Sequence, residues 1–63
     1  MDSEVAELER AVQYILQQLI ANESEPCQTL KTISERYLKV LLNRAIVKLN
    51  DARLKLEEQS QNQ

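Results

Sequence analysis

The sequence predicts an all-α fold: an antiparallel helical hairpin with a short first helix and a long second helix. The chain has no glycine and one proline among 63 residues, and it is rich in Leu, Glu, Gln, Lys, Arg and Ala, which favour helices most. Apolar residues recur at helical spacing on both sides of one short polar break. Because a single domain this small is marginally stable alone, we expect oligomerisation or a partner to complete the fold.

The first helix is expected over about residues 4–21. Its apolar side chains fall within an arc of about 140° when successive residues turn by about 100°. Tyr14 falls roughly opposite this arc, where it is either solvated or marks a second contact. Asp2 or Ser3 can cap the start of the helix. Five apolar residues keep the three-and-four spacing of a coiled-coil seam, and we expect them to form the core of the hairpin: Val5, Leu8, Val12, Ile15 and Leu19.

The turn is expected at residues 22–25. Asn22 and Ser24 favour turns and helix caps, and Pro26 suits the first turn of a following helix. The sequence therefore predicts two helices joined by a short connection, which makes them antiparallel neighbours.

The second helix is expected over about residues 26–58, although Thr32 and Glu35 form a capping box that allows a start near residue 33. The polar tail, residues 59–63, is expected to fray. Within the second helix, only Asn50–Asp51 could interrupt the helix, and a break there would give a compact three-helix monomer.

The apolar residues of the second helix form two sets. One follows a slowly drifting stripe, of which we assign four residues to the interior of the hairpin: Leu30, Ile33, Tyr37 and Val40. The other forms a face about 140° wide, which we assign to binding of a partner. The residues assigned to this partner-binding face are Leu38, Leu41, Leu42, Ala45, Ile46, Leu49 and Leu56. Since the first helix is only about 27 Å long against about 48 Å for the second, we expect the second helix to project beyond it from about residue 44.

Catalytic and metal-binding constellations are missing from the sequence. The absence of histidine removes Ser–His and Cys–His pairs and Cys/His zinc sites, and the absence of glycine removes glycine-rich phosphate loops. Cys27, the one cysteine, is interpreted as a small side chain in the first turn of the second helix, with a reactive thiol as the alternative. We therefore expect no enzymatic activity, no cofactor and no metal.

The charges are distributed unevenly between the two halves. Residues 1–26 hold six acids and one base, whereas residues 27–56 hold seven bases and two acids. Attraction between the two arms of a hairpin explains this pattern. A basic surface for RNA or DNA, formed by Arg44, Lys48 and Lys55, is the alternative, but the net charge of −2 and the lack of an aromatic row disfavour it.

Membrane insertion and export are not expected either. No run of the chain approaches the ~20 apolar residues of a membrane-spanning helix. The acidic start, MDSEVAELER, lacks the basic residues of a signal peptide. We therefore expect a cytoplasmic protein.

Two resemblances bear on function. The hairpin resembles in architecture the plasmid RNA-modulator Rop, a homodimeric four-helix bundle. The acidic first helix, the short break and the segment LLNRAIVKL at residues 41–49 resemble the small E-type co-chaperones of type III secretion needle subunits. Those hairpins pair with a larger helical-repeat chaperone, and together they keep the needle subunit soluble. This resemblance implies that Leu41, Leu42, Ala45, Ile46 and Leu49 meet the partner chaperone.

We therefore expect a non-catalytic, protein-binding helical hairpin that acts as a small adaptor or co-chaperone in a hetero-complex. A homodimeric four-helix-bundle regulator that binds RNA or DNA through the basic side of the second helix is the first alternative. A purely structural oligomerisation module of the coiled-coil type is the second.

Overall fold

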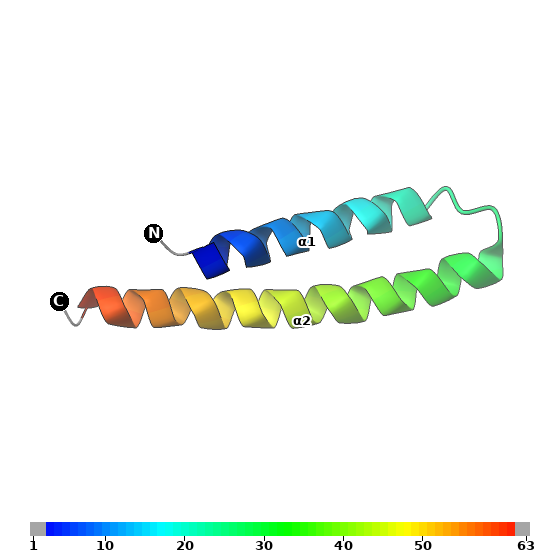
Figure 1. Cartoon of the computed structure of the whole chain (residues 1–63). Helices are drawn as coiled ribbons and strands as arrows, with labels where there is room; N and C mark the ends of the chain where they lie inside the picture. The colour runs from blue at the N-terminus through cyan, green and yellow to red at the C-terminus, as the bar shows by residue number, and fades with distance from the viewer. Residues whose placement is uncertain (1–2, 62–63) are drawn as a thin grey trace.

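The computed structural model describes residues 3–61, which form two antiparallel helices joined by a short connection (Figure 1). Helix α1 spans Ser3–Asn22, and helix α2 spans Gln28–Gln61. The helices pack against each other, and the molecule measures 54 × 16 × 10 Å along its principal axes. The predicted fold class is confirmed, because the described residues hold a short and a long helix in contact and no strand.

The end of α1 is tied directly to the first turn of α2. The amide nitrogen Nδ2 of Asn22 donates a hydrogen bond to the backbone carbonyl of Lys31, with a distance of 2.8 Å. The backbone N–H groups of Glu23, Ser24 and Glu25 donate to carbonyls three residues earlier. Such three-residue bonds satisfy carbonyls that the end of a helix leaves open.

Helix α2 begins two residues later than the sequence predicted. The Cys27 carbonyl accepts a hydrogen bond from the Lys31 N–H at 2.9 Å, so Cys27 caps the helix and Gln28 is its first residue. The Cys27 N–H donates to Oε1 of Glu25 at 3.3 Å. Pro26 therefore precedes the helix instead of lying in its first turn, and the alternative start near residue 33 is wrong.

Helix α2 continues without a break through Asn50 and Asp51. The Asp51 carboxylate lies 3.2 Å from Nζ of Lys55 one turn later, an ion pair of the kind that supports a helix. The three-helix alternative is therefore wrong. Helix α2 also includes residues 59–61, which were expected to fray, while Asp2 and residues 62–63 lie outside the described residues.

Helix α1 covers more of α2 than expected. A 20-residue helix is about 30 Å long. Helix α1 therefore lies alongside about 20 residues of α2, which begin near Lys31 and continue toward the C-terminus. At the far end Glu4 and Glu7 line one groove with Lys48 and Asp51, so the first turn of α1 lies near residue 51. Figure 1 shows that only the last turns of α2 extend past α1, and the expected projection from residue 44 is wrong.

The core between the helices is small. Three side chains are buried among the described residues: Ile15, Leu49 and Ala52. On α1, Val5, Leu8, Val12 and Leu19 are half-buried around Ile15, as a seam facing α2 requires. Three buried side chains give little hydrophobic stabilisation for the isolated hairpin.

The face of α2 that packs on α1 is the one that the sequence analysis assigned to partner binding. Leu49 is buried, and four other members of that face are half-buried: Leu38, Leu41, Leu42 and Ala45. Ile46 and Leu56 stay 39% and 42% exposed. The residues assigned to the interior are between 51% and 63% exposed, so that assignment is wrong for Leu30, Ile33, Tyr37 and Val40.

The reversal has a physical reason. Continued along the helix, the heptad spacing of Leu30, Ile33, Tyr37 and Val40 includes Arg44 and Asp51, whose burial between the helices would be costly. The opposite face instead carries Ala45 and Ala52, one heptad apart, where the two helices meet. Because alanine side chains are small, α1 can approach α2 closely on this side.

Candidate functional site

The candidate functional site is a line of apolar side chains along the outer side of α2, which we call the outward stripe. Each member is more than half exposed, and Tyr37 and Ile33 reach 63% and 59%. Single exposed apolar residues are ordinary on a soluble protein, but an aligned set marks an interaction site. The outward stripe consists of Leu30, Ile33, Tyr37, Val40, Val47 and Leu54.

The outward stripe has the spacing of a coiled-coil seam. Counting by three and four alternately from Leu30 gives eight consecutive seam positions that end at Leu54. Six positions are the apolar residues of the stripe, and the other two hold Arg44 and Asp51. At about 1.5 Å per residue, the seam is about 36 Å long.

The stripe lies on the side of α2 that faces away from α1. At about 100° per residue, its centre is roughly 140° around the helix from the face that packs on α1. Every residue of the stripe belongs to one continuous helix, α2, so the apolar side chains keep fixed relative positions. In Figure 1, α1 covers one side of α2 and leaves the opposite side open along its whole length.

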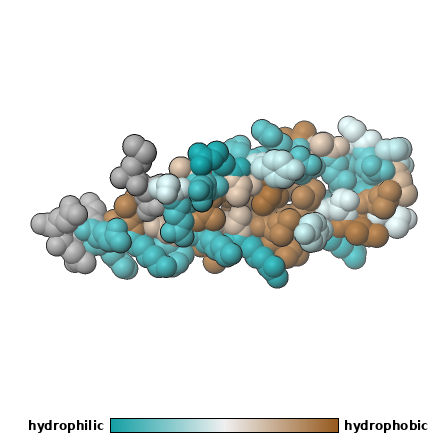
Figure 2. All heavy atoms as spheres, in the orientation of Figure 1, coloured by the Kyte–Doolittle hydropathy of each residue, from teal (hydrophilic) through white to brown (hydrophobic). Residues whose placement is uncertain are grey.

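The hairpin exposes more surface than a compact protein of its mass. Its accessible surface is 5251 Å², whereas a folded monomer of 7.3 kDa has about 4,200 Å². Its radius of gyration is 15.3 Å, against about 11 Å for a compact domain of this length. Figure 2 shows hydrophobic atoms at the surface, mainly in the half of the molecule nearest the connection. The surplus surface is therefore partly apolar.

Other exposed apolar side chains lie outside the stripe. On α1, Tyr14, Leu16 and Ile20 are 63%, 38% and 67% exposed. Tyr14 and Tyr37 are the same residue type with the same exposed fraction, one outside the stripe and one within it. This pair gives a matched comparison for experiments on the stripe.

Several ion pairs lie on the surface of the hairpin. Glu9 Oε2 on α1 lies 2.9 Å from Arg53 on α2, so the acidic first arm and the basic second arm do meet there. Glu35 and Lys39 lie 2.8 Å apart, one turn from each other on α2. All these side chains are well exposed, and such pairs contribute at most ~1 kcal/mol each.

The basic side predicted for nucleic acid is partly neutralised by carboxylates. Lys55 pairs with Asp51, and Lys48 borders a groove that Glu4 and Glu7 also line. A nucleic-acid surface neutralises several phosphates with clustered cations. Carboxylates beside these lysines would repel the phosphates.

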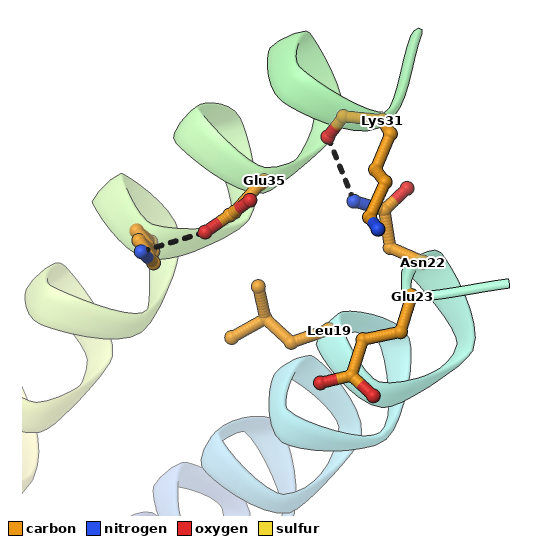
Figure 3. Close-up of a pocket in the computed structure, with 6 residues that line it drawn as sticks. Leu19, Asn22, Glu23, Lys31 and Glu35 are labelled. Atoms are coloured by element: carbon orange, nitrogen blue, oxygen red, sulfur yellow. Dashed lines mark hydrogen bonds and ion pairs between the residues drawn. The ribbon is translucent and has the colours of Figure 1, made fainter. Parts of the chain in front are cut away.

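A depression near the connection is lined by residues from both helices (Figure 3). Five of its six lining residues are polar or charged, and Leu19 is the apolar one. Within the described part of the chain, no cluster of three Cys, Asp or Glu residues is arranged to hold a metal ion. Cys27 is exposed at the start of α2. The lining residues are Leu19, Asn22, Glu23, Lys31, Glu35 and Lys39.

The pKa of the Glu35 carboxyl lies below its ordinary value of 4.5. The main cause is the hydrogen bond that Lys39 donates, followed by the positive charges of Lys39 and Lys31. This shift belongs to a surface ion pair and gives no sign of an acid–base centre.

No family model, curated protein or solved structure matches this chain. Over the described residues, neither helix combines the length and the hydrophobicity needed to span a membrane.

Proposed function

We propose that this chain is a non-catalytic protein-binding hairpin whose outward stripe docks on an apolar helix of a protein partner. The observation that carries the proposal is the alignment of six apolar side chains, each more than half exposed, in one coiled-coil seam on α2. An amphipathic helix that lays such a seam against another helix is a common mode of protein recognition.

The energetics favour a covered stripe. Burying the exposed half of each side chain contributes roughly 1 kcal/mol, so the six together contribute several kcal/mol before binding entropy is subtracted. The hairpin itself has only three buried side chains among its described residues. A partner on the stripe would therefore add stabilisation comparable to that of the hairpin's own core.

A small adaptor or co-chaperone in a hetero-complex is one form of this role. The resemblance to E-type co-chaperones implies a larger chaperone as partner, bound through Leu41, Leu42, Ala45, Ile46 and Leu49. Four of these five pack toward α1, and Ile46 is 39% exposed. A partner that leaves the hairpin intact would therefore bind through the outward stripe.

The test is affinity capture with the matched tyrosine pair. Tagged wild-type protein, Tyr37→Asp and Tyr14→Asp are expressed in the native cells, and the proteins that co-purify are identified and quantified. The proposal predicts that Tyr37→Asp loses the captured proteins, including untagged copies of the chain, and that Tyr14→Asp retains them. Equal capture by both variants would contradict the proposal, provided that circular dichroism shows both to be helical.

A further inference from the structure

We propose that the partner on the outward stripe is a second copy of this chain, with α2 packed antiparallel against α2; this inference rests on the proposed function. The resulting dimer would place the two α2 helices at its centre and one α1 on each outer side. The area of the open surface, the geometry of α2 and the charges in the seam support this arrangement.

The open surface is large enough for a stable dimer. The hairpin has about 1,000 Å² more accessible surface than a compact monomer of its mass. Each partner buries about 800 Å² in an interface of standard size. A second copy seated along α2 would therefore remove a surplus of the right magnitude.

The geometry of α2 allows a second copy to approach without a change in the hairpin. Helix α2 has 34 residues, or about 51 Å, in one uninterrupted helix. Because α1 packs on the opposite side, another α2 can lie along the stripe at the usual separation of 8–10 Å. The side chains that hold the hairpin together, Ile15, Leu49 and Ala52, stay where they are.

The two charged seam positions distinguish between the orientations. In a parallel pair with matching register, each Arg44 would face the other copy's Arg44, and each Asp51 the other Asp51. An antiparallel pair instead places each Arg44 near the other copy's Asp51 and moves the two Asp51 residues far apart, while the two Arg44 residues stay about 4.5 Å apart along the axis. The antiparallel pair thus has two attractive pairs against one repulsive pair, whereas the parallel pair has two repulsive pairs directly level with each other.

One antiparallel register overlaps more of α2 than any other that matches seam with seam. In this register, two residues at the same height along the axis, one from each copy, have numbers that add up to about 91. The two α2 helices overlap over most of their length, because this sum is close to twice the residue number at the midpoint of α2. Arg44 then lies level with the second copy's Val47 and within about 6 Å along the axis of its Asp51, which an arginine side chain can span. Arg36 lies beside the second copy's Glu57. Two-fold symmetry produces each contact twice.

The first experiment measures mass by sedimentation equilibrium over a range of concentrations. The wild-type chain, 7.3 kDa as a monomer, is expected to reach twice that mass. Val40→Asp is expected to raise the dissociation constant at least about 100-fold, because the change removes an apolar side chain and places a carboxylate level with the second copy's Asp51 in both halves of the seam. Ile20→Asp, at a position on α1 that is 67% exposed, is the control and should dimerise like the wild type.

The second experiment exchanges the two seam charges. Arg44→Asp and Asp51→Arg, each alone, should weaken the dimer roughly tenfold, because each puts like charges beside each other twice. The double variant carries the same pair in reverse and should return to within about threefold of the wild type. A parallel dimer would show no such rescue, because residues 44 and 51 would each face the same charge on the other copy in the wild type and in every variant.

The third experiment uses Cys27 as a native labelling site. Cys27 is exposed and is the one cysteine of the chain, so a spin label attaches there alone. In the antiparallel dimer the two labels lie about 55 Å apart along the axis. In a parallel dimer they would lie side by side, within about 20 Å.

Three results would overturn the second-copy inference: a monomer at every concentration, a dimer that Val40→Asp leaves intact, or a short distance between the labels. None of them alone removes the proposed function. If the chain is monomeric but Tyr37→Asp still abolishes capture of another protein, the stripe docks on that protein and the proposed function stands. If Tyr37→Asp also leaves the capture of other proteins unchanged, both the second-copy inference and the proposed function fail.

Discussion

At the residue scale, side chains of one type differ sharply in their surroundings. Leu49 is 7% exposed at the contact between the helices, Leu16 is 38% exposed beside that contact, and Leu54 is 57% exposed on the outward stripe. Leucines at the contact between the helices and leucines on the outward stripe are therefore separate sets. Substitutions can address one without the other.

Leu49→Ala is expected to destabilise the hairpin by about 2–3 kcal/mol, because it removes buried methyl groups and leaves a cavity that relaxes only in part. Leu16→Ala, on α1 and outside the stripe, should cost about 1 kcal/mol or less. Urea denaturation followed by circular dichroism in dilute solution measures both. Equal losses for the two variants would show that Leu49 is not at the core.

Lys39→Ala is expected to raise the pKa of Glu35 toward its ordinary value of 4.5, because the variant removes the hydrogen-bond donor and the nearest positive charge. Since the pKa is depressed in the folded state, the pair stabilises the fold above the ordinary pKa, and this contribution disappears as pH falls through the folded-state pKa. NMR titration of the Glu35 carboxyl carbon in the wild type and the variant measures the shift. An identical pKa in both would remove Lys39 as its cause.

At the element scale, the sequence was sufficient to predict where the helices lie but not which face of α2 packs on α1. Helical periodicity and the turn residues located both helices within a few positions. The side of α2 that faces α1 could not be decided from periodicity, since both sets of apolar residues are wide enough to pack. The deciding features were Ala45 and Ala52, which allow close approach, and the charges at Arg44 and Asp51, which interrupt the other set.

The outward stripe was visible in the sequence, although its role was assigned wrongly. The eight seam positions from Leu30 to Leu54 keep their spacing without a gap when Arg44 and Asp51 are included. Charged residues within an apolar heptad pattern favour a seam at an exposed interface over one inside a small core. Weighing those two residues would have placed the stripe on the outer side of α2.

Helix α2 is expected to behave as one helix through Asn50. Backbone amides of residues 48–53 should exchange hydrogen as slowly as those of residues 40–45, because both segments are helical and lie alongside α1. The segment beyond about residue 54, past the end of α1, should exchange faster in the monomer. Hydrogen exchange followed by NMR measures each amide, and rapid exchange confined to Asn50 and Asp51 would contradict a continuous helix.

At the scale of the whole molecule, the hairpin is long and thin. A body of 54 × 16 × 10 Å is one helix layer thick, so most side chains on its two broad faces remain accessible. Sequences of this size usually need additional stabilisation. Under the proposed function, a second protein chain docked on the outward stripe supplies this stabilisation.

Salt dependence separates protein binding from nucleic-acid binding. The complex formed through the stripe is expected to persist when the salt concentration rises from about 50 to about 200 mM, because apolar burial dominates it. A nucleic-acid complex with 6–10 phosphate contacts would weaken about 10³–10⁵-fold over the same range. Sedimentation of the complex at several salt concentrations measures this, and a loss of that size would favour the nucleic-acid alternative.

The measurement that tests the docking surface most directly is site-specific photo-crosslinking in native cells. A photoreactive amino acid replaces Tyr37 in one variant and Tyr14 in another, two positions of equal exposure, 63%, on different sides of the hairpin. The outward stripe predicts a discrete cross-linked protein adduct, to a second copy or to another protein, from position 37 and none from position 14. An adduct from position 14 alone, or none from either, would contradict the assignment of the stripe as the docking surface.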